Sequence, residues 1–125
     1  MKRRRVFVDA TFVRALLDDD VEKFNEARTV FASLLDEYER GETVLYSHAG
    51  MVAAVGGDRT DDLFRVCEVE PVRRQLRRRA WRLVNRISGL DENQAIALLM
   101  LRREAIGEIA TLDPLYAEMG VPTVC

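Results

Sequence analysis

The sequence predicts an α/β domain in which a mainly parallel sheet lies between layers of helices. Short runs rich in β-branched and aromatic residues alternate with segments whose apolar residues recur at a period near 3.6, and glycines close several of these segments. Strands that are separated by helices pair in parallel through right-handed crossovers. The chain of 125 residues has room for one such domain, which we place at residues 1–125.

Five runs predict strands, and we expect them to pair in one sheet. The predicted strands are residues 5–8, 43–46, 64–69, 107–111 and 121–124. The first strand ends directly before Asp9, and Pro122 lies inside the last one. Because proline cannot donate a hydrogen bond to a strand ladder, we expect the last strand at an edge of the sheet.

The segments between these strands predict helices. They are residues 12–17, 24–38, 51–55, 72–87 and 91–101, with a short helical turn after Asp113-Pro114 and a polar loop at 58–62. Asp91 and Gln94 have the spacing of a capping box, in which an acceptor is followed three residues later by Gln or Glu. Residues 95–101 are apolar on every side, which predicts a central, buried helix.

The composition of the chain argues against a disulfide-rich, secreted or membrane-spanning protein. Apolar residues make up 48% of the chain and charged residues 32%, and the net charge of −2 gives no global bias toward nucleic acid or membrane. Cys67 and Cys125 are too few and too far apart for a disulfide framework. The apolar run before Asp9 is too short for a signal peptide. No segment approaches the ~20 apolar residues that span a bilayer. We therefore expect a soluble, cytoplasmic protein.

Two acidic residues follow predicted strands. Asp9 comes directly after the first strand, and Asp113 comes just after the fourth. In an open parallel sheet, ligands bind beyond the carboxyl ends of the strands, so both carboxylates would point into one crevice if these strands are neighbours. A hard divalent cation, Mg²⁺ or Mn²⁺, would relieve their repulsion and activate water for hydrolysis. The alternative is that both residues are ordinary turn or helix-capping aspartates.

Three segments resemble PIN domains, and the likeness is greatest to the VapC-type toxin ribonucleases. The opening Val6-Phe7-Val8-Asp9-Ala10-Thr11 has a strand that runs into an acidic and a small hydroxylic residue. Residues 94–103 resemble the buried fifth helix of that family. Residues 111–116 and 120–124 resemble its closing segment, in which Thr and Asp precede an aromatic residue, a glycine and a valine-rich strand. The resemblance covers the whole chain in order and length.

The resemblance implies a strand order of 3-2-1-4-5 and a metal-dependent nuclease that uses four acidic ligands to cleave RNA. Asp9 and Asp113 match two of these ligands, whereas Ala53 and Gln94 stand where the family has the other two. Thr11 and Thr111 would then supply hydroxyl groups around the metal, and Gln94 would offer a neutral oxygen. Two missing carboxylates would weaken metal binding. The family also implies a homodimer and, in toxin members, an antitoxin partner.

Other acidic residues are available as substitutes, and the sequence leaves their role open. They are Asp58, Asp61 and Asp62 in the polar loop and Asp91 before the buried helix. The capping box favours Asp91 as a helix cap rather than a ligand. His48, the only histidine, follows the second strand and would be either a proton carrier or a packing residue.

One predicted helix is strongly basic. Its arginines are Arg73, Arg74, Arg77, Arg78, Arg79, Arg82 and Arg86. Together with residues 2–5 they can form a basic patch for RNA phosphates, for which we single out Arg73, Arg74, Arg77 and Arg78. The alternative is a solvated face that is paired with nearby acids. Trp81 lies in the same helix, where we expect it to be partly buried or at a dimer surface.

Two functions follow from these observations. The first is a VapC-like, metal-dependent endoribonuclease with an incomplete acidic site and therefore doubtful activity. The second is a catalytically degenerate PIN domain that binds RNA or a protein without cutting. A phospho-acceptor receiver domain is excluded, because the third strand ends in Glu70-Pro71 and no lysine follows Lys23. A nucleotide-binding fold is excluded because no glycine-rich loop follows the first strand.

Overall fold

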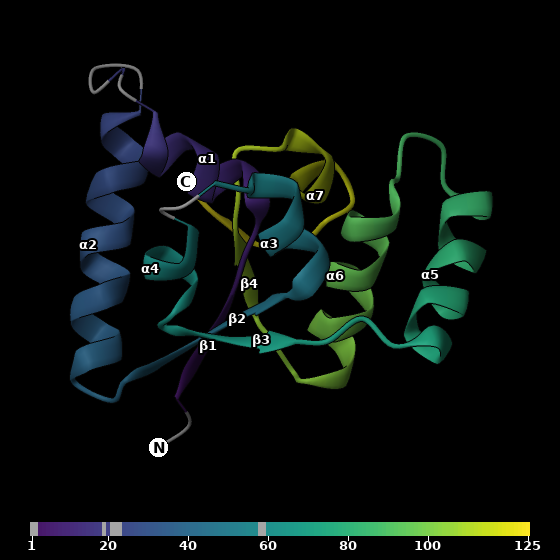
Figure 1. The fold of residues 1–125 in the computed structure, drawn as a ribbon, viewed down its shortest axis with the longest axis horizontal. Helices are drawn as coiled ribbons and strands as arrows, with labels where there is room; N and C mark the ends of the chain where they lie inside the picture. Colours follow the sequence, from purple (N-terminus) through teal and green to yellow (C-terminus); the bar gives the residue numbers. More distant parts are fainter. Residues whose placement is uncertain (1–2, 19, 21–23, 58–59) are drawn as a thin grey trace.

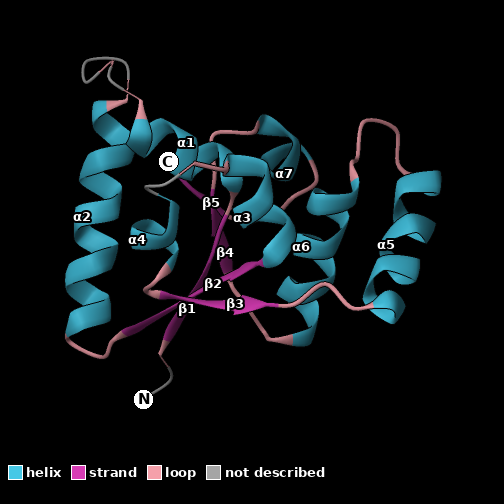
Figure 2. Cartoon of the chain, in the orientation of Figure 1, coloured by secondary structure: helices cyan, strands magenta, loops and turns pink. Residues whose placement is uncertain are grey.

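The computed structural model describes residues 3–18, 20, 24–57 and 60–125, and it shows one all-parallel sheet between helices (Figures 1 and 2). The sheet has five strands in the order β3-β2-β1-β4-β5, as predicted. The strands are β1 (Arg4–Val8), β2 (Thr43–His48), β3 (Cys67–Glu70), β4 (Glu108–Ala110) and β5 (Thr123–Val124). The predicted edge position of the last strand is confirmed, because β5 pairs only with β4.

Seven helices are present in the described part of the chain, and they cover both faces of the sheet (Figure 2). They are α1 (Ala10–Leu17), α2 (Asn25–Glu39), α3 (Ala49–Val55), α4 (Thr60–Phe64), α5 (Arg74–Arg86), α6 (Glu92–Arg103) and α7 (Pro114–Glu118). Most of these bounds agree with the predicted helices to within two residues. No helix among the described residues is long and apolar enough to cross a bilayer.

The central strand β1 divides the core into two clusters. Its side chains alternate between the faces of the sheet, so that Val6 and Val8 join one apolar cluster and Phe7 joins the other. The first cluster packs beneath α1, α2 and α4, and the second packs beneath α3, α5, α6 and α7. All three β1 residues are 3% exposed or less. This burial on both faces explains why the strand reads as a continuous apolar run.

The third predicted strand, residues 64–69, is partly wrong. Phe64, the first residue of this predicted strand, is instead the last residue of the short helix α4. The strand β3 begins only at Cys67. Leu63 and Phe64 both pack into the cluster beneath α2, although they are consecutive in sequence. A strand would direct such neighbours to opposite faces, whereas a helical turn can direct both inward. The predicted polar loop at 58–62 is likewise shortened by α4.

Candidate functional site

Asp9 and Asp113 lie at the same edge of the sheet, because their strands are neighbours. β1 pairs in parallel with β4, and each strand ends just before its aspartate. Asp9 is the N-cap of α1 and Asp113 is the N-cap of α7. Their side chains accept hydrogen bonds from the backbone nitrogens of Thr11 at 3.3 Å and Leu115 at 3.0 Å. Both the crevice position and the capping role that the sequence left open are therefore observed together.

The Asp9 carboxylate is surrounded by hydroxyl groups. It is 3% exposed, and its Oδ2 accepts from Thr11 Oγ1 at 2.5 Å and from Thr111 Oγ1 at 2.9 Å. Its Oδ1 accepts from the Tyr116 hydroxyl at 3.3 Å. Burial raises the pKa of Tyr116, and the nearby Asp9 charge raises it further, so that the phenol keeps its proton and donates. Asp9 thus has its acceptors satisfied by the protein itself.

The two threonines also connect the loops on either side of the site. Thr11 Oγ1 accepts from the backbone nitrogen of Leu112 at 3.0 Å, and Thr111 Oγ1 accepts from that of Asp113 at 2.9 Å. Each hydroxyl therefore accepts from a backbone N–H and donates to Asp9. This arrangement fixes the segment after β4 against the end of β1 and places Asp113 beside the crevice.

Gln94 is bonded at both ends of its side-chain amide. Its Oε1 accepts from the backbone nitrogen of Asp91 at 2.9 Å, and the Asp91 carboxylate accepts from the Gln94 backbone at 2.8 Å. The predicted capping box is thereby confirmed. The amide nitrogen of Gln94 donates to Asp113 Oδ2 at 2.6 Å. Because a backbone N–H can only donate, the Gln94 oxygen faces Asp91, and Gln94 offers an N–H rather than an oxygen to Asp113.

These side chains line a small cavity of about 90 Å³. The cavity brings together Asp9, Thr11, Gln94 and Asp113, whereas Thr111 lies behind Asp9 as a buried hydroxyl. Arg14 and Asn93 also line it, and the sequence analysis missed both. Arg14 follows Thr11 by one helical turn, so the helix period could have placed it at the same opening.

The structure shows where the residues lie that stand in place of the family's other acidic ligands. Ala53 is exposed and does not line the cavity, whereas Met51 and Ala54 do, so neither residue that α3 contributes to the lining is acidic. Of the candidate substitutes, Asp91 lines the cavity but caps α6. Asp62 instead pairs with Arg65 at the surface. Asp58 and the side chain of Asp61 lie outside the described residues.

The described side chains offer Mg²⁺ or Mn²⁺ few negatively charged oxygen ligands in this arrangement. These cations require several oxygen ligands, and Mg²⁺ in particular demands near-ideal geometry. Each carboxylate oxygen of Asp9 and Asp113 already accepts from a protein donor, and Gln94 directs an amide N–H rather than an oxygen at Asp113. Within the described ranges, no group of three or more His, Cys, Asp or Glu side chains is close enough to hold a metal ion.

His48 is a capping and packing residue, the second of the two alternatives. It is fully buried, and its Nδ1 accepts from the backbone nitrogen of Gly50 at 3.1 Å at the start of α3. The proton therefore lies on Nε2, which donates to the carbonyl oxygen of Asn93 at 3.0 Å. Burial lowers the pKa of His48, although the Asn93 carbonyl and the Asp9 charge oppose this shift.

The arginines of α5 lie on its outer face, away from this cavity's lining. Arg73, Arg74, Arg77 and Arg78 are all exposed, and of these Arg77 pairs with Glu92, its Nε lying 2.9 Å from Glu92 Oε1. Arg3 and Arg5, at the start of the described chain, are also exposed. Arg4 pairs with Glu37 and Glu108, and Lys2 lies outside the described residues.

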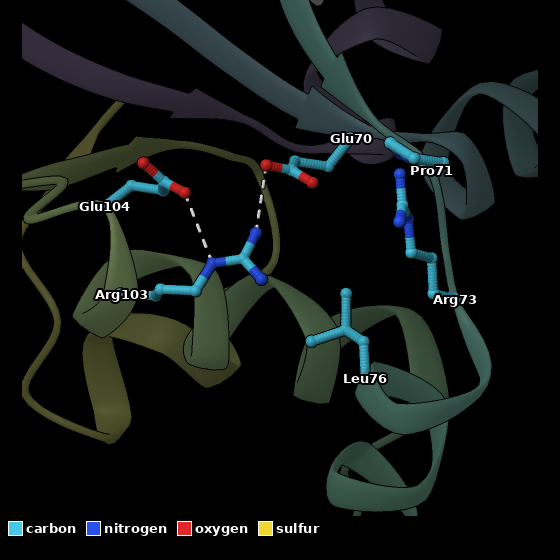
Figure 3. Close-up of a pocket in the computed structure, with 6 residues that line it drawn as sticks. All are labelled: Glu70, Pro71, Arg73, Leu76, Arg103 and Glu104. Carbon is cyan, nitrogen blue, oxygen red and sulfur yellow. Dashed lines mark hydrogen bonds and ion pairs between the residues drawn. The ribbon is translucent and has the colours of Figure 1, made fainter.

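A larger groove lies at the opposite end of α6 from the cavity (Figure 3). It has a volume of about 290 Å³ and is lined by Glu70, Pro71, Arg73, Leu76, Arg103 and Glu104. Arg103 bridges Glu70 at 2.9 Å and Glu104 at 3.2 Å, so these two carboxylates are paired with one guanidinium group. The smaller cavity is the better candidate site, because its polar groups converge at the carboxyl ends of the strands.

No protein-family model and no curated protein sequence matches this chain. A solved structure does match it: VapC20 of Mycobacterium tuberculosis, a toxin that cleaves the sarcin-ricin loop. The two superpose with a TM-score of 0.73 at 19% sequence identity, and the match covers 93% of this chain and 95% of that one. The structural match thus extends over nearly the whole of both chains. The chain therefore has the fold of a VapC-type PIN domain.

Proposed function

We propose that this chain is a catalytically degenerate PIN-fold domain that binds RNA without metal-dependent cleavage. One observation carries the proposal: the Gln94 amide nitrogen donates to Asp113 at 2.6 Å, while the Gln94 oxygen is held by the backbone of Asp91. An amide N–H occupies the position in which a metal-binding site needs a further oxygen. The expected fourth position is equally unsuited, since the residues that line the cavity from α3, Met51 and Ala54, offer no carboxylate.

RNA is the proposed ligand because a basic surface remains although the acidic site is reduced. Arg73, Arg74 and Arg78 are exposed and make no ion pair with any described residue, so their charge is available to phosphates. Contacts of this kind dominate nucleic-acid affinity and make it strongly dependent on salt. The fold similarity to an RNA-cleaving toxin agrees with this ligand class. The expected homodimer and antitoxin partner remain predictions.

The competing function is a metal-dependent endoribonuclease. In that case Asp9 and Asp113 would hold Mg²⁺ or Mn²⁺, Thr11 and Thr111 would orient them, and Gln94 would have to rotate its oxygen toward the ion. Rotation would break both the Gln94–Asp113 bond and the acceptor half of the capping box. The metal would therefore have to offset two hydrogen bonds before it could bind.

Calorimetric titration with Mn²⁺ separates the two functions. The natural chain should show no saturable binding up to millimolar metal, and it should leave RNA uncut in the presence of Mg²⁺ or Mn²⁺. A variant that combines Gln94→Glu with Ala54→Glu restores two carboxylates at the cavity and should bind Mn²⁺, with Asp9→Asn added to that variant as the matched control. Saturable binding to the natural chain that is lost in its Asp9→Asn variant would overturn the proposal.

RNA binding needs its own measurement. The natural chain should bind RNA with an affinity that falls steeply between about 50 and 200 mM salt. Replacement of Arg74 and Arg78 by glutamine should weaken this binding, whereas replacement of Arg40 and Arg65, which make ion pairs elsewhere on the surface, should not. Equal effects of both pairs, or no binding at low salt, would contradict the proposed ligand.

A further inference from the structure

The outer face of α5 carries an unusual concentration of positive charge. Six of its 13 residues are arginine, and none is acidic. The inner face is apolar, with Leu76 and Ala80 buried in the core. Figure 1 shows α5 at one end of the molecule, beside α6 and away from the other helices. The arginine face is therefore turned outward rather than toward the sheet.

Four of these arginines form a row along the helix. Arg74, Arg78, Arg82 and Arg86 follow one another at four-residue intervals, which places successive members about 6 Å apart along the axis. All four are exposed, and none forms an ion pair with another residue that the structure describes. A row of like charges at this spacing is unfavourable for an isolated helix. It is, however, comparable with the spacing of successive phosphates along an extended nucleic-acid strand.

Trp81 lies beside this row of arginines on α5. It is 50% exposed, more than any other large hydrophobic side chain in the described part of the chain. Helical spacing places it beside Arg77, Arg78 and Asn85. Half of a large aromatic surface is thus left in water among cationic side chains. Trp81 is therefore partly buried, as expected, but half of its side chain is exposed.

The combination of an arginine row and an exposed indole distinguishes among ligands. The carboxylates of an acidic peptide would satisfy the guanidinium groups, but these acidic side chains have no flat ring to cover the indole. Duplex RNA offers phosphates, but its bases are stacked and its major groove is too deep and narrow for side chains to read. A single strand offers both phosphates and unpaired bases, and base–aromatic stacking is a major source of affinity in single-strand binding.

We propose that Arg74, Arg78 and Arg82 bind the phosphates of single-stranded RNA while one unpaired base stacks on Trp81. This inference rests on the proposed RNA-binding function and adds to it the form of the RNA and the surface that selects it. The surface lies on α5, whereas the residues that line the acidic cavity come from α1, α3, α6 and the segments beside them. Binding by this surface does not require the cavity to be functional.

Trp81 is the only tryptophan in the chain, so its fluorescence reports directly on stacking. The natural chain is titrated with a 12-nucleotide oligouridine and, separately, with a blunt RNA duplex of the same length. The single strand should quench the fluorescence in a saturable way, whereas the duplex should not. Fluorescence anisotropy of labelled RNA then gives affinities for variants that lack the indole.

Four variants test the roles of the residues. Trp81→Ala should weaken single-strand binding by about 10-fold or more and change duplex binding less than two-fold. Trp81→Phe should restore most of the affinity, and Tyr38→Ala, which removes another partly exposed aromatic side chain, should have no effect. Arg78→Gln combined with Arg82→Gln should reduce the salt slope of single-strand binding by about 0.7 for each arginine.

The possible failures have different meanings. If single-stranded and duplex RNA bind equally well and Trp81→Ala changes neither, the stacking inference is overturned while the proposed RNA-binding function stands. If the chain binds neither RNA at low salt, the proposed function fails as well. If an acidic peptide of equal charge competes as effectively as the oligouridine, the surface recognises charge alone and the inference is again overturned.

Discussion

At the scale of single residues, the site is held together by hydrogen bonds rather than by an ion. Thr11, Thr111 and Tyr116 all direct hydroxyl hydrogens at Asp9. Charge-assisted bonds of this kind stabilise a buried carboxylate in the way that a cation would in a metal site. On the proposed function these residues form a structural cluster, and this view predicts how they respond to substitution.

Asp9→Asn should lower the free energy of unfolding by about 1–3 kcal/mol, because one end of the new amide would present hydrogens to hydroxyl donors. The sign is informative. In a site whose carboxylates are clustered to hold a metal, removing one charge from the metal-free protein would relieve repulsion and stabilise it. Urea unfolding of the metal-free protein measures the difference. Asp36→Asn, at an exposed surface pair, serves as the control and should change stability by less than about 0.5 kcal/mol.

His48 should make stability depend on pH. Burial lowers its pKa in the folded state, so the unfolded chain takes up a proton near its ordinary pKa of 6.5 while the folded chain does not. The contribution is constant above that pH and is lost as the pH falls below it, with a slope of at most about 1.4 kcal/mol per pH unit. Unfolding measured from pH 7.5 to 5 should show this slope in the natural chain.

His48→Asn keeps an acceptor for the Gly50 nitrogen but cannot titrate, so it is the matched comparison for that slope. Carboxylates contribute equally to both proteins in this range, and the difference between the two curves isolates the histidine. Parallel curves would mean that His48 takes up its proton over the same pH range in the folded protein as in the unfolded chain. Its Nδ1 would then not be held as an acceptor for Gly50.

At the scale of elements, much of the site could be predicted because it depends on local sequence. The position of Asp9 after a strand and the capping box of α6 both follow from spacing, and both are observed. The orientation of the Gln94 amide could not be predicted, because it depends on Asp113, which is 19 residues away in sequence and meets it only in the folded sheet. The helix α4 was missed because strand propensity outweighed the inward packing of Leu63 and Phe64.

The contact between α3 and α6 gives a prediction at this scale. A Cβ added at Gly50 would lie 2.2 Å from Asn93 Oδ1 and 2.9 Å from the His48 ring. Asn93 cannot simply turn away, since its Nδ2 donates to the Gly50 carbonyl oxygen at 3.2 Å. Gly50→Ala should therefore destabilise the protein by about 1–3 kcal/mol, although alanine is favoured over glycine in a helix by about 1 kcal/mol.

A double-mutant cycle identifies the cause of this destabilisation. In an Asn93→Ala background the closest contact is removed, and the penalty of Gly50→Ala should shrink by about 1 kcal/mol or more. The contact with His48 remains, so the penalty should not vanish. Additive effects of the two substitutions in urea unfolding would show that α3 can shift relative to α6 without cost.

At the scale of the whole molecule, the positive charges are concentrated in one segment although the net charge is small. The chain has 19 basic residues and a net charge of −2, yet seven of its arginines lie at 73–86, where no acidic residue occurs. The rest of the chain is correspondingly acidic. Such separation gives a local positive field that can steer a polyanion despite the negative total, and it also makes α5 repel itself.

This self-repulsion should be visible in the stability of the free protein. The pairs Arg74–Arg78, Arg78–Arg82 and Arg82–Arg86 each oppose helix formation by about 0.2–0.5 kcal/mol at low salt. Raising the ionic strength from about 20 to 300 mM screens them, so the free energy of unfolding should rise by about 1 kcal/mol. Arg78→Gln combined with Arg82→Gln removes all three pairs and should be more stable than the natural chain at low salt, with a flatter salt dependence. The same variant should bind RNA less well, so that stability and affinity change in opposite directions. A natural chain that loses stability with added salt would show that its arginines are instead stabilised by acids across the surface, and that their charge is not available to a ligand.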